Sequence, residues 1–199
     1  TVVEEVVQAI SWETPDSFVI IRSTVLPGTA QRLRERYSLC ISSNPEFLKE
    51  SSAFWDLYFS KFILIGPCCK ASEQILQDIW GPLRSPIIAT SSTTAEMVKL
   101  ITNIYAATLI SFWNSVREVA DSLGINGDEI ARIASTIDER VTKYGTITGK
   151  AFGGKCLPKD LEQFLQLCEK LSCDSELFKA VKRVNSRQSV SNDFVRGSL

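Results

Sequence analysis

The stretch Phe-Val-Ile-Ile-Arg-Ser-Thr-Val-Leu-Pro-Gly-Thr, residues 18–29, decides the fold class. Its first five residues, 18–22, are expected to form a strand: four β-branched or aromatic side chains in succession, followed by Arg22, are typical of a strand that is covered on both faces. Pro27 and Gly28 then interrupt the run, and the pattern from Ala30 to Tyr37 is helical. A buried strand followed at once by a helix predicts a βαβ unit and therefore a parallel sheet.

The same alternation continues in both directions from this stretch. Further strands are expected at 39–42, 62–65 and 86–89, with a helix at 71–80 between the last two strands. The helical spacing of the valines and Ile10 in residues 2–10 predicts a helix at the start of the chain. Parallel strands of this kind are joined by right-handed crossovers. The sequence therefore predicts an α/β fold with a partial doubly wound parallel sheet.

The second half of the chain has a different pattern. A helical apolar stripe runs from Thr94 to Leu123 and is closed by Gly124, and further helices are expected at 128–135, 158–171 and 175–194. We therefore predict an α/β region at 1–91, and a long connecting helix with an all-helical region at 92–199. The long helix is more apolar than one small sheet can cover, so this region is expected to form a homodimer.

Composition excludes several classes of partner. Lys and Arg number 22 against 23 Asp and Glu, so there is no basic field to attract nucleic acid or an anionic membrane. No apolar run approaches the roughly 20 residues needed to cross a bilayer, and the start of the chain lacks the pattern of a secretory signal. The expected location is the cytoplasm.

Cysteine and histidine usage restricts the chemistry. The six cysteines include no C-x-x-C pair, so neither a metal site nor a disulfide is expected, and most of them lie in apolar or helical contexts that predict burial. The chain has no histidine, which removes the usual general base and every Cys-His or Ser-His arrangement. Acid–base chemistry must then use Asp, Glu, Lys, Tyr or water.

The exception among the cysteines is Cys156, which lies in the segment Ala-Phe-Gly-Gly-Lys-Cys-Leu-Pro-Lys-Asp-Leu, residues 151–161. Gly153 and Gly154 allow a ligand to approach the backbone closely, and Pro158 suits the first turn of a helix. The segment therefore predicts a thiol that a glycine-rich turn delivers to the start of a helix.

Charged neighbours favour a reactive form of this thiol. Lys155, Lys159 and the helix N-terminus stabilise the thiolate of Cys156, and Asp160 lies in the first helical turn, where it can orient a water or a lysine. The alternative interpretation is a passive cysteine at a helix start with Asp160 as a capping residue.

Three other segments carry polar groups in suggestive places. Lys99 and Asn103 are four residues apart on the long helix and share a face, although a solvated polar face would give the same pattern. Residues 42–50, Ser-Ser-Asn-Pro-Glu-Phe-Leu-Lys-Glu, follow the second strand, and residues 22–29 follow the first, at the edge where open α/β sheets place their ligands. Glu46 is positioned to act at that edge.

Taken in order, these motifs resemble those of the nucleotide-sugar 6-dehydrogenases, the UDP-glucose/GDP-mannose dehydrogenase family. The matching segments are Ser23-Thr24-Val25 with Pro27-Gly28-Thr29, Asn44-Pro45-Glu46-Phe47-Leu48, Lys99 with Asn103, and Phe152-Gly153-Gly154 with Cys156 and Lys159-Asp160. The resemblance implies a Rossmann-like remnant at 1–91 and the family's dimerisation region at 92–199. It also implies NAD-dependent oxidation of a UDP-sugar 6-hydroxyl to a uronic acid in two hydride transfers, through a thiohemiacetal and a thioester on the cysteine.

The resemblance also implies roles for individual residues. Cys156 is the nucleophile, Lys99 stabilises the oxyanions, and Asp160 with Thr24 and Asn103 organises water and proton transfer. Glu46 resembles the carboxylate that serves thioester hydrolysis. The implied substrate-binding residues are Phe47, Leu48, Phe152, Gly153 and Gly154, and the implied cofactor-binding residues are Ser23, Thr24, Glu50 and Lys159.

The resemblance covers the central region of the family only. Neither the family's G-x-G-x-x-G turn, which holds the dinucleotide phosphates, nor its C-terminal nucleotide-sugar domain is expected here. Two alternatives therefore stay open: a cofactor-independent enzyme that acts on an acyl thioester through Cys156, and a non-catalytic dimerisation module.

Overall fold

The computed structural model describes residues 1–48, 52–154 and 156–196, and it divides into two compact units, Thr1–Leu100 and Ile101–Leu199. The first unit is mixed α/β and the second is helical. No helix in the described ranges is long and apolar enough to cross a membrane.

The first unit contains four short parallel strands in two pairs. β1 (Phe18–Ile21) pairs with β2 (Cys40–Ser43), and β3 (Ile63–Ile65) pairs with β4 (Ile87–Ala89). An isolated bridge between Ser43 and Gly66 joins the ends of β2 and β3. The predicted partial parallel sheet is therefore confirmed, and each observed strand lies within one residue of its predicted bounds.

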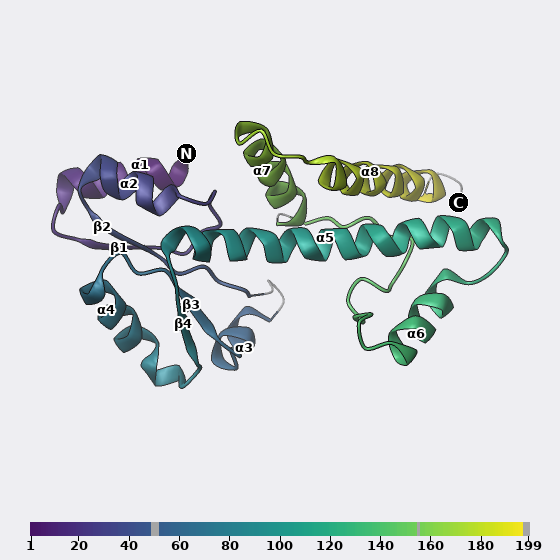
Figure 1. Ribbon diagram of the computed structural model, residues 1–199, viewed down its shortest axis with the longest axis horizontal. Helices are drawn as coiled ribbons and strands as arrows, with labels where there is room; N and C mark the ends of the chain where they lie inside the picture. Colours follow the sequence, from purple (N-terminus) through teal and green to yellow (C-terminus); the bar gives the residue numbers. More distant parts are fainter. Residues whose placement is uncertain (49–51, 155, 197–199) are drawn as a thin grey trace. The chain divides into compact units, whose positions relative to one another are not determined.

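Helices pack on both strand pairs (Figure 1). α1 (Val2–Glu13) and α2 (Thr29–Tyr37) lie beside β1 and β2, and α4 (Lys70–Trp80) lies beside β3 and β4, followed by the short 3-10 helix η1 (Gly81–Leu83). Their apolar faces form two cores: Val7, Ile21, Ala30, Leu33, Leu39 and Ile41 in one, and Ile63, Ile65 and Leu76 in the other. Val7 belongs to the spacing that predicted the first helix, and Ile21 belongs to the apolar run that predicted the first strand.

One helix of this unit was not predicted. α3 (Ala53–Tyr58) is only six residues long, and its aromatic side chains are largely exposed, with Phe54 at 69% and Trp55 at 60%. A helix this short with no buried stripe has no period that sequence reasoning can detect.

α5 (Ser92–Ser122) is the predicted long helix, and it begins in the first unit against the sheet edge. A side chain at Gly66 would meet the Cα of Ser92 at 2.6 Å, so glycine is required for this close approach. Buried Glu96 on α5 accepts hydrogen bonds from the amides of Gly28 (2.7 Å), Thr29 (3.2 Å) and Ala30 (2.9 Å). Its carboxylate thereby fills the N-terminus of α2.

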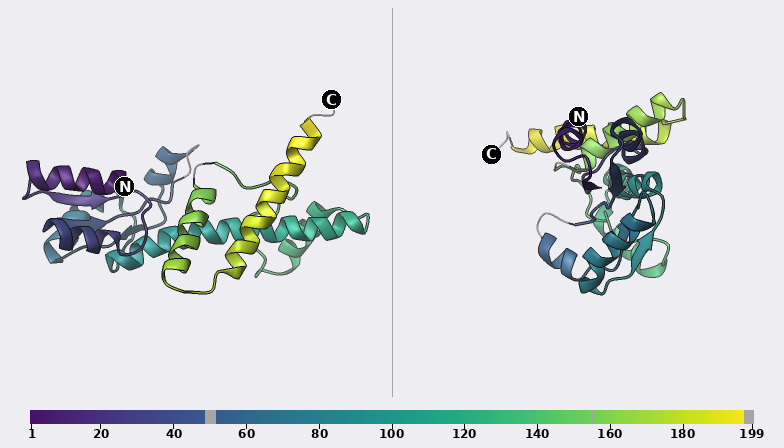
Figure 2. Two further views of the ribbon diagram at one scale, coloured as in Figure 1. Left: turned by 90° about the horizontal axis from the view of Figure 1, so that it is seen from above. Right: turned by 90° about the vertical axis from the view of Figure 1, so that its left-hand side faces the viewer.

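The second unit contains the rest of α5, α6 (Gly127–Ile137), α7 (Leu157–Lys170) and α8 (Glu176–Arg196). α7 and α8 pack side by side (Figure 2), with the rings of Phe164 and Phe178 in edge contact at 4.8 Å between centroids. Ser111 on α5 donates a hydrogen bond to the carbonyl of Val181 on α8 at 3.3 Å. The segment between α6 and α7 is irregular and leads to the glycine turn before Cys156.

Candidate functional site

Cys156 occupies the N-cap position of α7 and is exposed. Pro158 follows in the first turn, where its missing amide hydrogen costs nothing. Gly154 has φ of +75°, a backbone conformation that favours glycine, whereas a side chain at Gly153 would meet no atom within 4 Å. The structure therefore presents the thiol to solvent at a helix start, as the sequence predicts.

Asp160 lies one turn further along α7 and is fully buried. Asn103 on α5 donates from Nδ2 to Oδ2 of this carboxylate at 2.5 Å, and the ammonium of Lys159 lies 3.0 Å from Oδ1 in an ion pair. Among the described residues, Oδ1 receives no hydrogen bond of good geometry. A buried carboxylate with one unused acceptor can accept a hydrogen bond from a water or a substrate hydroxyl.

A second asparagine fixes the glycine turn itself. Asn185 on α8 accepts a hydrogen bond from the amide of Phe152 at 2.7 Å and donates one to the carbonyl of Phe152 at 3.0 Å. Phe152 is buried, and the two glycines after it are exposed. Asn185 was not among the predicted site residues, because its partner is 33 residues away and only the fold brings them together.

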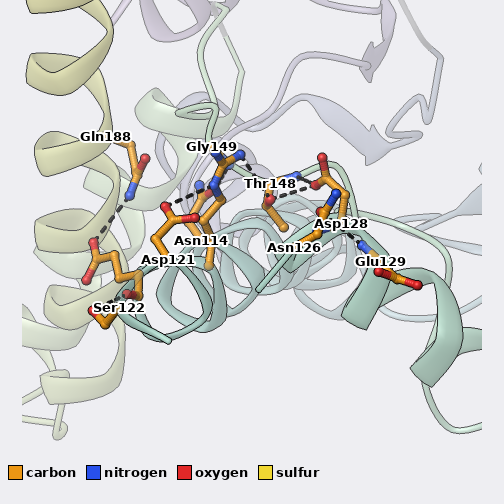
Figure 3. Close-up of polar contacts among 11 residues, drawn as sticks. Asn114, Asp121, Ser122, Asn126, Asp128, Glu129, Thr148, Gly149 and Gln188 are labelled. Atoms are coloured by element: carbon orange, nitrogen blue, oxygen red, sulfur yellow. Dashed lines mark hydrogen bonds and ion pairs between the residues drawn. The ribbon is translucent and has the colours of Figure 1, made fainter. Parts of the chain in front are cut away.

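The segment before the turn is fixed by a polar cluster between α5 and α6 (Figure 3). Thr148 donates from its amide (2.9 Å) and its hydroxyl (2.6 Å) to the carboxylate of Asp128, and these hydrogen bonds hold the pKa of Asp128 below its ordinary value. Asn114 accepts from the amide of Gly149 and donates to the carbonyl of Lys150, both at 2.8 Å. The backbone that carries Cys156 is thus hydrogen-bonded to helices on the way into the turn.

In the first unit, Lys99 and Glu46 form a half-buried ion pair. The Nζ of Lys99 lies 3.6 Å from Oε1 of Glu46 and 5.3 Å from the centre of the Phe47 ring, and only 8% of the Lys99 side chain is exposed. Oε2 of Glu46 accepts the amide of Leu48 at 2.6 Å. Lys99 is therefore not on a solvated polar face, which was the alternative interpretation.

The Asn44 side chain anchors the segment that carries Glu46. Its Oδ1 accepts from Arg22 (2.6 Å) and from the indole of Trp80 (3.0 Å), and its Nδ2 donates to the carbonyl of Leu64 (2.8 Å). The fully buried Asn44 side chain thus makes three hydrogen bonds. They hold the start of the segment that carries Glu46 against β3.

The structure thus brings together two sets of the predicted residues. One set, in the first unit, is Glu46, Phe47, Leu48 and Lys99. The other, in the second unit, is Asn103 on α5 with Lys159 and Asp160, which follow Cys156 in the first turn of α7. Ser23 and Thr24 lie in the loop between β1 and α2. Glu50 and Lys155 lie outside the described residues.

The expected burial of most cysteines is wrong. Only Cys168 is buried, while Cys69, Cys156 and Cys173 are exposed, because the last three lie at the ends of helices rather than on their inner faces. Hydrogen bonds from the backbone and hydroxyl of Ser72 lower the pKa of Cys69 to about 7. Burial, together with the neighbouring Cys68 thiol, raises the pKa of Cys40 to about 12.

The residues described for the first unit do not fit the phosphates of a dinucleotide. Such phosphates bind at an open helix N-terminus after a glycine-rich turn. The N-terminus of α2 is filled by Glu96, that of α4 is capped by Cys69 and Ser72, and the 199 residues contain no G-x-G-x-x-G.

Known proteins match nearly the whole chain. Residues 1–84 match the model described as UDP-glucose/GDP-mannose dehydrogenase family, NAD binding domain, and residues 93–187 match that family's central domain. The chain is 33% identical over 181 residues to a UDP-glucose 6-dehydrogenase of Bacillus subtilis, a match that covers 87% of this chain and 41% of the relative. It is 30% identical over 200 residues to the GDP-mannose 6-dehydrogenase of Pseudomonas aeruginosa, a match that covers 94% of this chain and 46% of that relative.

A solved structure shows the same fold. The UDP-glucose dehydrogenase from Pyrobaculum islandicum superposes with a TM-score of 0.87 at 31% identity, over 93% of this chain and 45% of that chain. The chain thus spans less than half the length of each of these relatives. Both family models and the fold agree with the order of motifs in the sequence, and the chain belongs to the UDP-glucose/GDP-mannose dehydrogenase family.

Proposed function

We propose that this chain supplies the covalent-catalysis residues of a nucleotide-sugar 6-dehydrogenase, with Cys156 as the nucleophile toward the sugar C6 carbon. The observation that supports this most is an exposed cysteine at the start of α7 with a buried, hydrogen-bonded carboxylate, Asp160, one turn later. The names of the relatives favour a UDP- or GDP-linked hexose as the substrate. NAD is the hydride acceptor that the family description implies.

The first step assigned to this chain is addition to an aldehyde. The Cys156 thiolate forms a C–S bond to the C6 aldehyde carbon, the π electrons of the carbonyl move to oxygen, and that oxygen takes up a proton to give a thiohemiacetal. The exposed position of Cys156 at the start of α7 leaves its sulfur open to an aldehyde. Lys99, held in a largely buried site, is the cation proposed to stabilise the oxyanion.

The second step assigned to this chain is thioester hydrolysis. The step starts from a Cys156 thioester at C6, which is two electrons more oxidised than the thiohemiacetal; NAD, where the family's complete fold holds it, would supply that oxidation. Water then adds to the thioester carbonyl, the C–S bond breaks, and the products are the sugar carboxylate and the Cys156 thiol. The roles that we propose from the family resemblance are proton acceptance from that water by Asp160 and service in thioester hydrolysis by Glu46; within the second unit, Asn103 donates the hydrogen bond that orients Asp160.

The remaining assignments concern binding. We propose that Phe47, Leu48, Phe152, Gly153 and Gly154 contact the substrate, and that Ser23, Thr24, Glu50 and Lys159 lie on the cofactor side. The exposed backbone at Gly153 and Gly154 is consistent with close approach of a sugar. A homodimer is the proposed assembly.

The aldehyde addition can be tested without the cofactor. A nucleotide-sugar aldehyde labelled with ¹³C at C6, in UDP-glucose and GDP-mannose forms, is added to the reduced protein, and the labelled carbon is followed by NMR. We expect a new thiohemiacetal resonance with the wild-type protein and with Cys173→Ser, and none with Cys156→Ser. A resonance that persists in Cys156→Ser, or none with the wild-type protein, would contradict the proposal.

A further inference from the structure

Three cysteines that the proposed chemistry does not use meet in the first unit. The Sγ atoms of Cys40, Cys68 and Cys69 all lie within 4.8 Å of one another. Cys40 begins β2, and Cys68 and Cys69 stand between β3 and α4, 28 residues further along the chain. The three cysteines do not form a short metal-binding motif such as C-x-x-C, so the sequence did not predict a metal site.

We propose that Cys40, Cys68 and Cys69 form a site for one soft, thiophilic metal ion of the Zn²⁺ class. Thiolate sulfur is the preferred ligand of such ions. The three side chains come from two separate segments of one unit, so the fold and not local sequence assembles the site.

The spacing of the sulfurs suits a shared ion. Two thiolates bound to one zinc ion at about 2.3 Å in tetrahedral geometry stand about 3.8 Å apart. The Sγ atoms of Cys68 and Cys69 are 3.8 Å apart. Those of Cys40 and Cys68 are 2.6 Å apart, so a rotation of one side chain must separate them by roughly 1 Å when the ion enters.

The backbone that carries two of the ligands is already positioned. The amide of Cys68 donates to Oγ of Ser42 at 3.0 Å, and the amide of Cys69 donates to Oγ of fully buried Ser72 at 3.0 Å. Ser72 in turn donates to the carbonyl of Cys69 at 2.7 Å. A site whose ligands are fixed before binding loses little conformational entropy when the ion arrives.

The fourth coordination position is accessible to solvent. Cys69 is exposed, while Cys40 and Cys68 are half-buried, so the ion would be reached from one side only. Oγ of Ser72 lies 3.4 Å from Sγ of Cys68. Three sulfurs and one water complete a tetrahedral site for zinc.

The pair Cys40 and Cys68 could instead form a disulfide, which would leave Cys69 unused. The two possibilities predict different behaviour of the reduced protein. Three free thiols can bind a metal ion, whereas a Cys40–Cys68 disulfide forms only when an oxidant is present. The presence of the third thiol within reach of both others favours the metal site.

The test uses metal-free protein reduced with a phosphine under anaerobic conditions and titrated with Cd²⁺, whose thiolate complexes absorb in the ultraviolet. We expect saturation at one ion per chain, and competition by Zn²⁺. Removing one thiolate should weaken binding by more than about tenfold, since even indirect ligand support is worth at least that. Cys40→Ser, Cys68→Ser and Cys69→Ser should each show this loss, and Cys173→Ser, which changes an exposed thiol of the second unit, should not.

A second measurement needs no substitution. One equivalent of Zn²⁺ should slow alkylation of Cys68 and Cys69 in the wild-type protein and leave Cys156 and Cys173 unaffected. The proposal is overturned if reduced protein shows no saturable Cd²⁺ absorption, or if binding survives all three substitutions. A Cys40–Cys68 disulfide in air-exposed protein, combined with no metal binding by the reduced form, would replace it with a redox pair.

Discussion

Asn103 on α5 donates a hydrogen bond from Nδ2 to Oδ2 of Asp160 on α7, at 2.5 Å and across 57 residues of sequence. Both residues belong to the second unit, and Asp160 is fully buried there. This contact joins the long helix to the helix that begins after Cys156, so it connects stability of the helical unit with the position of the proposed water-activating carboxylate.

Replacing Asn103 by Ala should therefore destabilise the helical unit. The substitution leaves Oδ2 of a buried carboxylate without its donor, which costs about 1–3 kcal/mol of unfolding free energy. Urea unfolding followed by circular dichroism measures the effect. Ser122→Ala, at the exposed end of the same helix, is the control and should change stability by less than about 0.5 kcal/mol. Equal stability of Asn103→Ala and the control would show that the contact is not formed in solution.

Asn185 should control the order of the glycine turn. Asn185→Ala removes both hydrogen bonds to Phe152, which frees the backbone at residues 152–154 while leaving the thiol in place. We expect faster proteolytic cleavage in this turn and a loss of about 1–3 kcal/mol of unfolding free energy. Ser186→Ala, one residue along α8 and exposed, is the matched control. If both variants are cleaved at the same rate, Asn185 does not hold the turn.

The Thr148–Asp128 contact should depend on pH. Hydrogen bonds from Thr148 lower the pKa of Asp128 in the folded protein, so the folded state binds this proton less readily than the unfolded state. The resulting stability is present above the unfolded pKa of about 4 and is lost as pH falls through the lower folded pKa. Thr148→Val should therefore be less stable than wild type at pH 7, and the difference should shrink in acid. A difference that stays constant down to pH 2 would mean that Asp128 does not take part.

Alkylation should distinguish the cysteines. Brief treatment with iodoacetamide at pH 7.5, followed by mass mapping, should modify Cys69 and Cys156 before Cys40 and Cys168. Ser72 lowers the pKa of Cys69 to about 7, whereas burial raises the pKa of Cys168 and that of Cys40, the latter to about 12. Earlier modification of Cys40 or Cys168 would contradict this order.

The fold was largely predictable because its elements have regular apolar periods. The run at residues 18–22 and the stripe of α5 each identify their element without any tertiary information. The sequence did not predict α3, because its six residues have no buried apolar stripe.

The site was predictable only in part. The resemblance supplied the named positions, but the partners of Phe152 and Asp160 lie 33 and 57 residues away, and the Cys40–Cys68 approach spans 28. Such contacts depend on how helices and strands pack, and a sequence pattern with a period of two or 3.6 residues does not encode them.

The exposed face of α5 is the surface through which we expect the protein to form a homodimer. Tyr105, Phe112 and Val119 are seven residues apart and are 56%, 56% and 61% exposed, so they form one apolar stripe on one side of the helix. The opposite side of the helix carries Ala107 and Asn114, which are both fully buried. A stripe with heptad spacing suits packing against a second copy of the same helix, since each side chain can fill a gap between two others.

Phe112→Glu should break this association. A charge in the middle of the stripe should raise the dimer dissociation constant by at least about thirtyfold, the effect of losing about 2 kcal/mol at a central aromatic residue. Sedimentation velocity at micromolar concentration measures it. Ile137→Glu, which changes an exposed apolar residue at the end of α6, is the control and should dimerise like the wild type. A monomeric wild-type protein, or equal dimerisation of both variants, would remove α5 as the dimer interface, because then the stripe at residues 105–119 would contribute nothing to association.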